Sequence, residues 1–335
     1  MVNIIMPVYN AHNTLRQAIG SVIMQDDLDN ILLTIVDDCS TEPYDYLLDE
    51  FKFMNIEIMR KDTNTGCGQS RQYGIDRCKC KYFMFLDADA VDHNINLYNA
   101  LELAYMNPEL SRASAKIKKF TDFIEELNDD SFFLHQNSGV WMHGKMFRTS
   151  YIQDNDIRYN ETRLHEDHAF NFITRICGGK LLYIDYTTYI WRRNGDSLTR
   201  SDSHTFDVAM INFIENAKYV IVEYVKRKVS EQCIAETVKK YLLSLYKYYN
   251  FAICDKVSDN VMKWYIQQIK SFISMVPHNV RETLTFDYLI SSLYSDDTID
   301  SMISENIVIH AGIREYYDII MNPYHECGIT KQNIL

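Results

Sequence analysis

Residues 31–40 are Ile31-Leu32-Leu33-Thr34-Ile35-Val36-Asp37-Asp38-Cys39-Ser40, an apolar run followed at once by two aspartates. The run consists of β-branched residues and leucine without a polar alternation, which is typical of a strand buried on both faces. Strands of this kind belong to parallel sheets that helices cover. The two aspartates are therefore expected at the carboxyl end of a parallel strand, where open α/β sheets bind their ligands.

The alternation of apolar runs with amphipathic segments continues on both sides of this strand. It predicts strands at 2–6, 31–36, 56–59 and 82–86, and helices at 13–24, 44–51 and 68–77. Pro7 is expected to end the first strand. Repeated strand–helix units with short connections predict an open, mainly parallel α/β sheet flanked by helices.

The character of the sequence changes toward the C-terminus. A helix is predicted at 95–106, a polar loop at 122–130 and a returning strand at 181–189. Helical periodicity then dominates, with helices expected at 206–229, 231–249, 261–275 and 284–293. We expect two domains, an α/β domain over residues 1–204 and a helical C-terminal domain over residues 205–335.

Composition excludes several classes of protein. Hydrophobic residues make up 47% of the 335, so disorder and low complexity are excluded, and the net charge of −12 argues against a general nucleic-acid binder. The eight cysteines form no CxxC pair, which favours free thiols, with Cys78 and Cys80 at a buried helix end rather than on a metal. No apolar run approaches the ~20 residues of a spanning helix, and the N-terminus does not resemble a signal peptide. We expect a soluble, cytoplasmic protein.

Acidic residues also end the fourth predicted strand, in Asp87-Ala88-Asp89. Carboxylates gathered at one sheet edge repel one another unless a divalent cation or donors from a ligand compensate them. Residues 64–71, Asn-Thr-Gly-Cys-Gly-Gln-Ser-Arg, match neither a dinucleotide fingerprint nor a phosphate loop. A nucleotide sugar or a similar diphosphate remains, with Asp38 accepting from the base, Arg71 near the phosphates, and Asp87 and Asp89 on a metal.

A second acidic group lies in His165-Glu166-Asp167-His168, directly before an amphipathic segment. The spacing of the two histidines differs from that of a zinc-protease helix. Acids in the first turn of a helix complement its dipole, which is a purely structural explanation. The alternative is that one of these acids is a general base beside the bound ligand.

These segments together resemble a family 2 glycosyltransferase of the GT-A fold, over about residues 1–200. The resemblance is carried by residues 4–10, 36–41, the pattern of Asn64, Gly66, Ser70, Arg71, Gly74 and Ile75, residues 85–89, 144–148 and Glu166-Asp167. It implies transfer of a sugar from a nucleotide-diphosphate sugar, commonly a UDP-sugar, to a hydroxyl of a glycan or other acceptor. It also implies a metal-dependent, inverting reaction by one in-line displacement. The helical C-terminal third lies outside it.

The resemblance implies a role for each matching residue. Pro7, Tyr9 and Asn10 would line the nucleotide end, Asp38 would bind the base, and Arg71 would lie near the nucleotide. Asp87 and Asp89 would form the metal motif, with Asp89 the direct ligand of Mn2+ or Mg2+. Asp167 would take the proton of the acceptor hydroxyl, and Glu166 would position the acceptor.

Two positions depart from the family pattern. Ala90 stands where a third aspartate is common, and Asn194 stands where many members have a histidine, which leaves the third metal ligand open between water, Asn194 and Asp196. The neighbouring Arg192 and Arg193 either face the diphosphate or are two solvated arginines.

Alternative functions remain at this point. The acceptor could be a hydroxymethylated base in DNA, as for bacteriophage enzymes; the net charge disfavours this, but Lys116, Lys118 and Lys119 form a local basic strip. From another class, the chain could be a non-catalytic nucleotide-sugar binder or scaffold. Tyrosines of the C-terminal helices, such as Tyr249, either pack against other helices or form an oligomer interface or acceptor platform.

Overall fold

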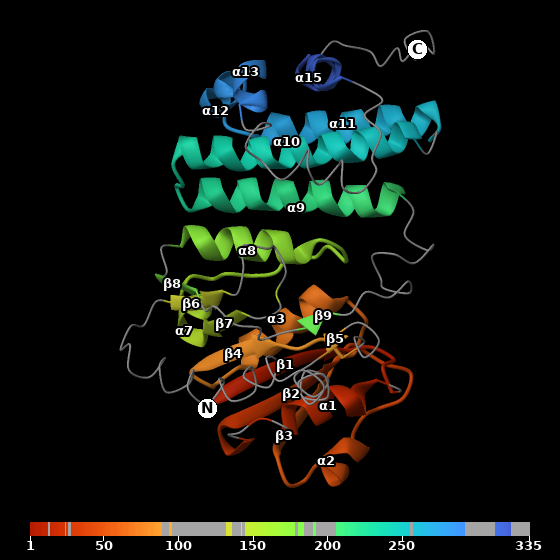
Figure 1. Cartoon of the computed structure of the whole chain (residues 1–335), viewed down its shortest axis with the longest axis vertical. Coiled ribbons are helices and arrows are strands. Elements are labelled where there is room, and N and C mark those ends of the chain that lie inside the picture. The colour runs from red at the N-terminus through yellow and green to blue at the C-terminus, as the bar shows by residue number, and fades with distance from the viewer. Residues whose placement is uncertain are drawn as a thin grey trace, which may run out of the picture. The chain divides into compact units, whose positions relative to one another are not determined.

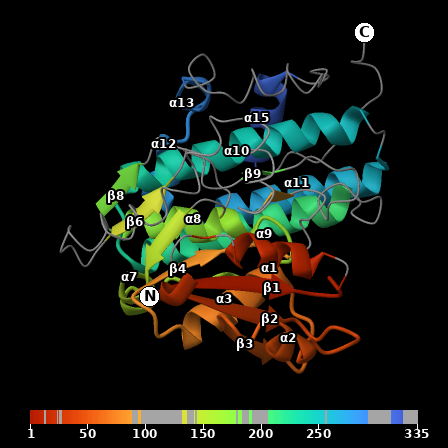
Figure 2. The ribbon, with the colours of Figure 1, turned by 60° about the horizontal axis from the view of Figure 1, so that its bottom comes forward.

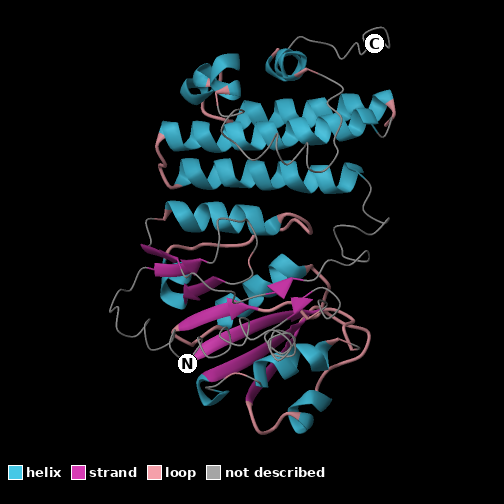
Figure 3. Cartoon of the chain, in the orientation of Figure 1, coloured by secondary structure: helices cyan, strands magenta, loops and turns pink. Residues whose placement is uncertain are grey.

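The computed structural model describes residues 1–12, 14–23, 25, 28–88, 94–95, 132–135, 142, 145–177, 180–183, 190–191, 206–254, 257–291 and 312–322. The chain divides into two compact units, Met1–Ser201 and Asp202–Leu335. The described part of the first unit contains both strands and helices, whereas that of the second contains helices (Figures 1 and 3).

The first unit is built on one seven-stranded sheet. Its order is β3 (Asn55–Arg60), β2 (Ile31–Asp37), β1 (Val2–Val8), β4 (Tyr82–Phe85), β7 (Lys145–Arg148), β6 (Phe132–His135) and β8 (Lys180–Tyr183). The first four strands are mutually parallel; β7 runs antiparallel to both β4 and β6, and β8 is parallel to β6. This confirms the expected open, mainly parallel sheet.

Pro7 does not end the first strand, which continues to Val8, so that prediction was wrong. The carbonyl oxygen of Ile5 accepts from the backbone N–H of Leu86, so Ile5 faces β4. The backbone of Pro7, two residues further along β1, is directed to the same neighbouring strand. There β4 has already ended at Phe85, and the missing N–H of proline breaks no pairing of the ladder.

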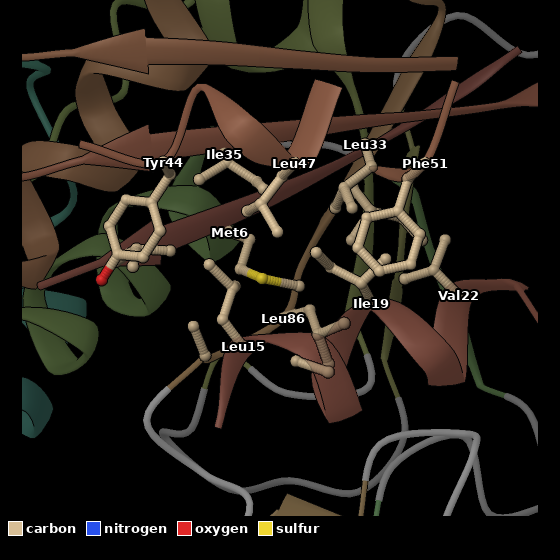
Figure 4. Packing of buried hydrophobic residues seen from close by; sticks show 14 of the residues in the cluster. Met6, Leu15, Ile19, Val22, Leu33, Ile35, Tyr44, Leu47, Phe51 and Leu86 are labelled. Carbon is tan, nitrogen blue, oxygen red and sulfur yellow. The ribbon is translucent and has the colours of Figure 1, made fainter. Parts of the chain in front are cut away.

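Helices cover both faces of the sheet. On one face, α1 (Leu15–Ile23) and α2 (Tyr46–Glu50) enclose a core in which Leu15, Ile19 and Leu47 meet Met6 and Leu33 of the strands (Figure 4). A short 3-10 helix, Leu28–Asn30, leads into β2. Every second residue of β1 and β2 points into this core, and the intervening residues point to the other face.

The other face carries α3 (Cys67–Arg77). A Cβ at Gly74 would lie 2.6 Å from Cγ2 of Ile5 on β1, so glycine permits α3 to pack this closely on the sheet. Next to it, α7 (Thr149–Asp154) follows β7, and α8 (Glu166–Ile176) packs through Phe170 on Phe147 of β7, with ring centroids 5.7 Å apart. The start of α8 is thereby held beside α3.

The middle of the chain departs from expectation at one described position. Asn94–Ile95 is a strand, β5, paired antiparallel with β9 (Ile190–Trp191), where a helix from residue 95 was predicted. The partner of β5 is β9, which lies far along the sequence. The local pattern of apolar residues around residue 95 does not reveal such a pairing. The rest of the predicted helix, the polar loop at 122–130 and residues 184–189 of the predicted strand lie outside the described residues.

The second unit is helical. Its helices are α9 (Phe206–Lys226), α10 (Glu231–Cys254), α11 (Asp259–Met275), α12 (His278–Thr283), α13 (Phe286–Ile290) and α15 (Ile313–Met321). Helix α9 packs against both α10 and α11, and α15 packs against α11 (Figure 2). The helix predicted at 284–293 corresponds to α13, which begins after its cap Thr285 and ends at Ile290, and the preceding α12 was not predicted.

Several tyrosines of the second unit are buried inside it. Tyr241, Tyr249, Tyr265 and Tyr316 are each at most 2% exposed. The hydroxyls of Tyr265 and Tyr316 donate to backbone carbonyls of α10, at 2.5 Å to Leu245 and 3.1 Å to Leu242. Tyr265 and Tyr316 therefore supply apolar area together with a satisfied polar tip, which supports the packing interpretation.

No helix in the described ranges is long and apolar enough to cross a membrane. Six described cysteines are free thiols, and Cys78 and Cys80 lie buried just after α3, as expected of a helix end.

Candidate active site

The carboxyl ends of β1, β2 and β4 bring the predicted residues of the first unit to one edge of the sheet. Tyr9 and Asn10 follow β1, Asp38 follows β2, and Asp87 follows β4. Since these strands are parallel neighbours, the sequence interpretation of a shared rim is confirmed for these positions.

Asp38 lies in a cradle of donors. Its carboxylate accepts from the backbone N–H groups of Thr65 at 3.0 Å and Gly66 at 2.7 Å, and from Nζ of Lys61 at 2.6 Å. Asp38 is 3% exposed, and Gly66 reaches it with a φ of 92°, a conformation that favours glycine. The side chain that we expect to bind a base is thus fixed before any ligand arrives.

The loops after β1 and β2 are tied to each other. The backbone N–H of Asn10 donates to Oγ of Ser40 at 3.0 Å, and Oδ1 of Asn10 accepts from the N–H of Thr41 at 2.9 Å. Asn10 therefore shapes the rim through its side chain, whereas Tyr9 is 52% exposed and can contact a ligand directly. Pro7 is buried within β1 and supports this loop from below.

Three carboxylates meet on one guanidinium. Arg71 of α3 donates through Nη2 to Oδ1 of Asp87 at 2.8 Å, and through Nη1 to Oε1 of Glu166 at 3.0 Å and Oδ1 of Asp167 at 2.8 Å. The arginine is 3% exposed and lies over the rings of Phe85 and Tyr159, at 5.6 and 6.0 Å. Two acidic motifs separated by about eighty residues of sequence thus form one cluster, which we call the Arg71 cluster: Arg71, Asp87, Glu166 and Asp167.

The sequence assigned Arg71 to the nucleotide phosphates. A phosphate contact stays a prediction; the structure gives the guanidinium carboxylate partners instead. It is the compensating charge that acids at a sheet edge require, and it comes from the protein itself. Sequence reasoning considered a cation or a ligand for that purpose and missed the arginine.

Electrostatics in this cluster are set by burial. Burial alone would lower the pKa of Arg71, but Asp167, Cys67 and Asp87 outweigh it, so the pKa is raised and the guanidinium stays charged. Burial, and next the charge of Asp167, raises the pKa of Glu166 to about 8. Glu166 is therefore mostly protonated at neutral pH, which leaves Arg71 to balance Asp87 and Asp167.

Gly68 and Tyr159 are site residues that the motifs did not identify. A Cβ at Gly68 would lie 2.6 Å from Cγ of Glu166 and 3.3 Å from the ring of Tyr159. Only a residue without a side chain lets Glu166 pass over the first turn of α3 to Arg71. The closeness of two glycines, Gly66 and Gly68, was the available signal in the sequence.

The helix start expected at residues 165–168 is present. His165 takes a left-handed conformation (φ 62°) immediately before α8, and Glu166 and Asp167 occupy the first turn of the helix. Burial lowers the pKa of His165 to about 4 and that of His168 to about 3, so both rings are neutral at pH 7. The structural and catalytic explanations for the two acids are both compatible with this geometry.

Asp89, Arg192 and Arg193 lie outside the described residues, as do Ala90 and Asn194. Among the residues that the structure does describe, no three His, Cys, Asp or Glu side chains are grouped to hold a metal ion. Of the predicted metal motif the structure describes Asp87, whose carboxylate offers the hard oxygen ligands that Mn2+ and Mg2+ take.

The fold defines an α/β domain of GT-A type, and the rim at the carboxyl ends of its parallel strands is its candidate ligand site. Residues 3–167 match the family model of Glycosyl transferase family 2. The chain belongs to this family and is a glycosyltransferase.

Relatives agree with this assignment. The glycosyltransferase GlyG of Streptococcus pneumoniae is 20% identical over 263 residues, which are 70% of this chain and 81% of GlyG. The minor teichoic acid biosynthesis protein GgaB of Bacillus subtilis is 34% identical over 90 residues, 26% of this chain and 10% of GgaB. The crystal structure of S. aureus TarS 1-349 in complex with UDP-GlcNAc has a TM-score of 0.64 at 18% identity, covering 94% of this chain and 92% of that one.

Proposed function

We propose that this glycosyltransferase moves a sugar from a UDP-sugar to a hydroxyl of a glycan or related acceptor, with inversion in a single displacement. The observation that carries the proposal is the Arg71 cluster, in which the acid after β4 meets the acids that begin α8. TarS, which shares the fold, binds UDP and UDP-GlcNAc, and this supports a UDP-sugar donor.

The nucleotide would bind at the part of the rim formed by the loops after β1 and β2. Asp38, held by its cradle, would accept from the base, and Tyr9 would contact the nucleotide with its exposed ring. Because the donors of the cradle hold the carboxylate in place, the binding of the base costs no reorganisation of Asp38. Arg192 and Arg193 remain predicted contacts of the diphosphate.

The reaction would take place at the Arg71 cluster. Asp167, whose side chain is 17% exposed, would accept the proton of the acceptor hydroxyl as the sugar is transferred. Arg71 holds Oδ1 of this carboxylate and so orients it. Protonated Glu166 would hydrogen-bond to the acceptor and position it.

A divalent metal would be held by Asp89 and Asp87. When bound, it would neutralise the charge that develops on the leaving diphosphate. Arg71 supports this arrangement by fixing Oδ1 of Asp87.

We further assign catalysis to residues 1–204 and a cytoplasmic location to the protein. A glycan acceptor is favoured over DNA by the net charge of −12, and GgaB, a protein of teichoic acid biosynthesis, points the same way. An oligomer through the C-terminal helices remains a prediction. The alternative of a non-catalytic scaffold is set aside, because the chain is a glycosyltransferase.

Thermal-shift screening of UDP and a panel of UDP-sugars, with and without Mn2+, tests the donor. A cognate ligand at a hundred times its Kd stabilises a protein by about 2.7 kcal/mol. We expect UDP-sugars to raise Tm more with Mn2+ than without it, and Asp167→Asn to keep this shift while losing transfer. No shift with any UDP compound would contradict the proposal.

A further inference from the structure

A lysine is buried at the start of β7, behind α8. Lys145 is 1% exposed, and its Nζ donates to Oδ1 of Asn171 at 2.6 Å. An ammonium in such a place is costly, and an apolar side chain of the same length would fill the position without that cost.

Its partner Asn171 reaches back to the first turn of α8. Nδ2 of Asn171 donates to the backbone carbonyl of Asp167 at 2.8 Å and to Sδ of Met142 at 3.1 Å. Because the ammonium of Lys145 requires the oxygen of the amide, the nitrogen of the amide must face Asp167. The lysine thus fixes the orientation of Asn171, and Asn171 holds the backbone of Asp167.

Asp167 is therefore fixed from two sides. Its carboxylate is held by Arg71 at 2.8 Å, and its carbonyl by Asn171. Lys145 is also close enough for the negative charge of Asp167 to act on it, although burial lowers the pKa of the lysine to about 7. The carboxylate of Asp167 is thus held from α3, and its carbonyl by an amide of α8 that Lys145 of β7 orients.

We propose that Lys145 is a positioning residue for Asp167, acting through the amide of Asn171. The inference rests on the proposed role of Asp167 as base. It gives a part in the reaction to β7, which lies in the segment 144–148 that helps to carry the family resemblance but to which no residue role was assigned.

Two variants test this positioning role. Binding is measured with UDP, and activity is measured as the release of UDP from the UDP-sugar that supports turnover. Lys145→Met removes the charge at similar length. Asn171→Asp keeps an acceptor for Lys145 but has no donor for the carbonyl of Asp167. A merely structural role predicts that Asn171→Asp retains both fold and activity, because the buried ammonium gains a charged partner.

Tyr151→Phe is the matched control. The hydroxyl of Tyr151 is also buried and also donates to a carbonyl of α8, at 2.6 Å, but to Thr174 at the far end of the helix. Its removal should lower stability as much as the loss of any buried hydrogen bond, with kcat within twofold of the native protein.

We expect both test variants to lower kcat tenfold or more, with the Kd of UDP unchanged within twofold. If the kcat of Asn171→Asp were within twofold of the kcat of Tyr151→Phe, the proposal would be overturned. Asn171→Asp decides alone if Lys145→Met does not fold. Asp167→Asn, measured in parallel, separates the two levels. If it loses turnover while the test variants keep it, only the positioning role is wrong; if it keeps turnover, the base assignment is wrong and this inference falls with it.

Discussion

The acids after β2 and the acids of the Arg71 cluster lie at the same sheet rim but are held in opposite ways. Asp38 and Asp37 are satisfied locally, by backbone N–H groups and by Lys61 and Arg60, the residues at the end of β3 and just beyond it. The Arg71 cluster depends on a single guanidinium for carboxylates from β4 and α8.

The difference accords with the proposed division of the rim into a nucleotide-binding part and a reacting part. Several hydrogen-bond donors hold the carboxylate of Asp38 in place, so a ligand would bind to it with little rearrangement. In the Arg71 cluster one guanidinium faces three carboxyl groups, so a net negative charge remains. A bound cation or a transferred proton would neutralise that charge. The comparison predicts that the cradle tolerates the loss of one donor, and that the cluster does not tolerate the loss of Arg71.

Arg71→Met should have the largest effect. It leaves buried carboxylates without their cation, and breaking a buried pair in this way costs about 3–5 kcal/mol. Urea unfolding measures the loss, and we also expect glycosyl transfer to fall below detection. Arg158→Met is the control, because Arg158 pairs with Asp76 at the surface, where such pairs contribute at most about 1 kcal/mol. Equal losses in the two variants would break the comparison.

Glu166→Gln should change how stability depends on pH. The pKa of Glu166 is raised from 4.5 to about 8, so the folded protein binds a proton that the unfolded chain releases, and stability falls as pH rises through this interval. The variant lacks this loss. Relative to the native protein it should gain stability from pH 5 to pH 8, by at most about 1.4 kcal/mol per pH unit. If the difference in stability between the variant and the native protein were the same at every pH, Glu166 would be ionised at neutral pH.

Gly68→Ala tests the close approach of α3 and α8. The added methyl would meet Cγ of Glu166 at 2.6 Å, and overpacking of this kind costs about 1–3 kcal/mol. In the Glu166→Ala background the obstacle is gone, so the two substitutions should be strongly non-additive. Gly312→Ala, where nothing lies within 4 Å of the new Cβ, should cost far less. Additive effects at 68 and 166 would place Glu166 elsewhere.

Lys61→Met should cost less stability than Arg71→Met. Asp38 keeps the N–H groups of Thr65 and Gly66, so only one of its donors is lost, at about 1.5–3 kcal/mol for a hydrogen bond to a charged group. Chemical unfolding compares this value directly with that of Arg71→Met. A larger loss at Lys61 than at Arg71 would reverse the assignment of the two regions.

The sequence predicted the parts of the site that depend on strand order. Unbroken apolar runs identified β1, β2 and β4, and the acids that follow them, Asp38 and Asp87, lie where expected. Pro7 was misjudged because the end of its partner strand cannot be seen from β1 alone. The pairing of Arg71 with Glu166 and Asp167 joins residues 95 and 96 positions apart, and no local pattern records it. The same holds for Gly68 and for Lys145, whose burial depends on α8.

Calorimetric titration of UDP into Asp38→Asn and Asp167→Asn tests the division of the rim most directly. We expect Asp38→Asn to weaken UDP binding at least tenfold, because it disturbs both the cradle and the contact with the base. Asp167→Asn should bind UDP within twofold of the native protein although it no longer transfers sugar. Unchanged binding by Asp38→Asn, or an equal loss in both variants, would contradict the separation of a nucleotide half from a reacting half.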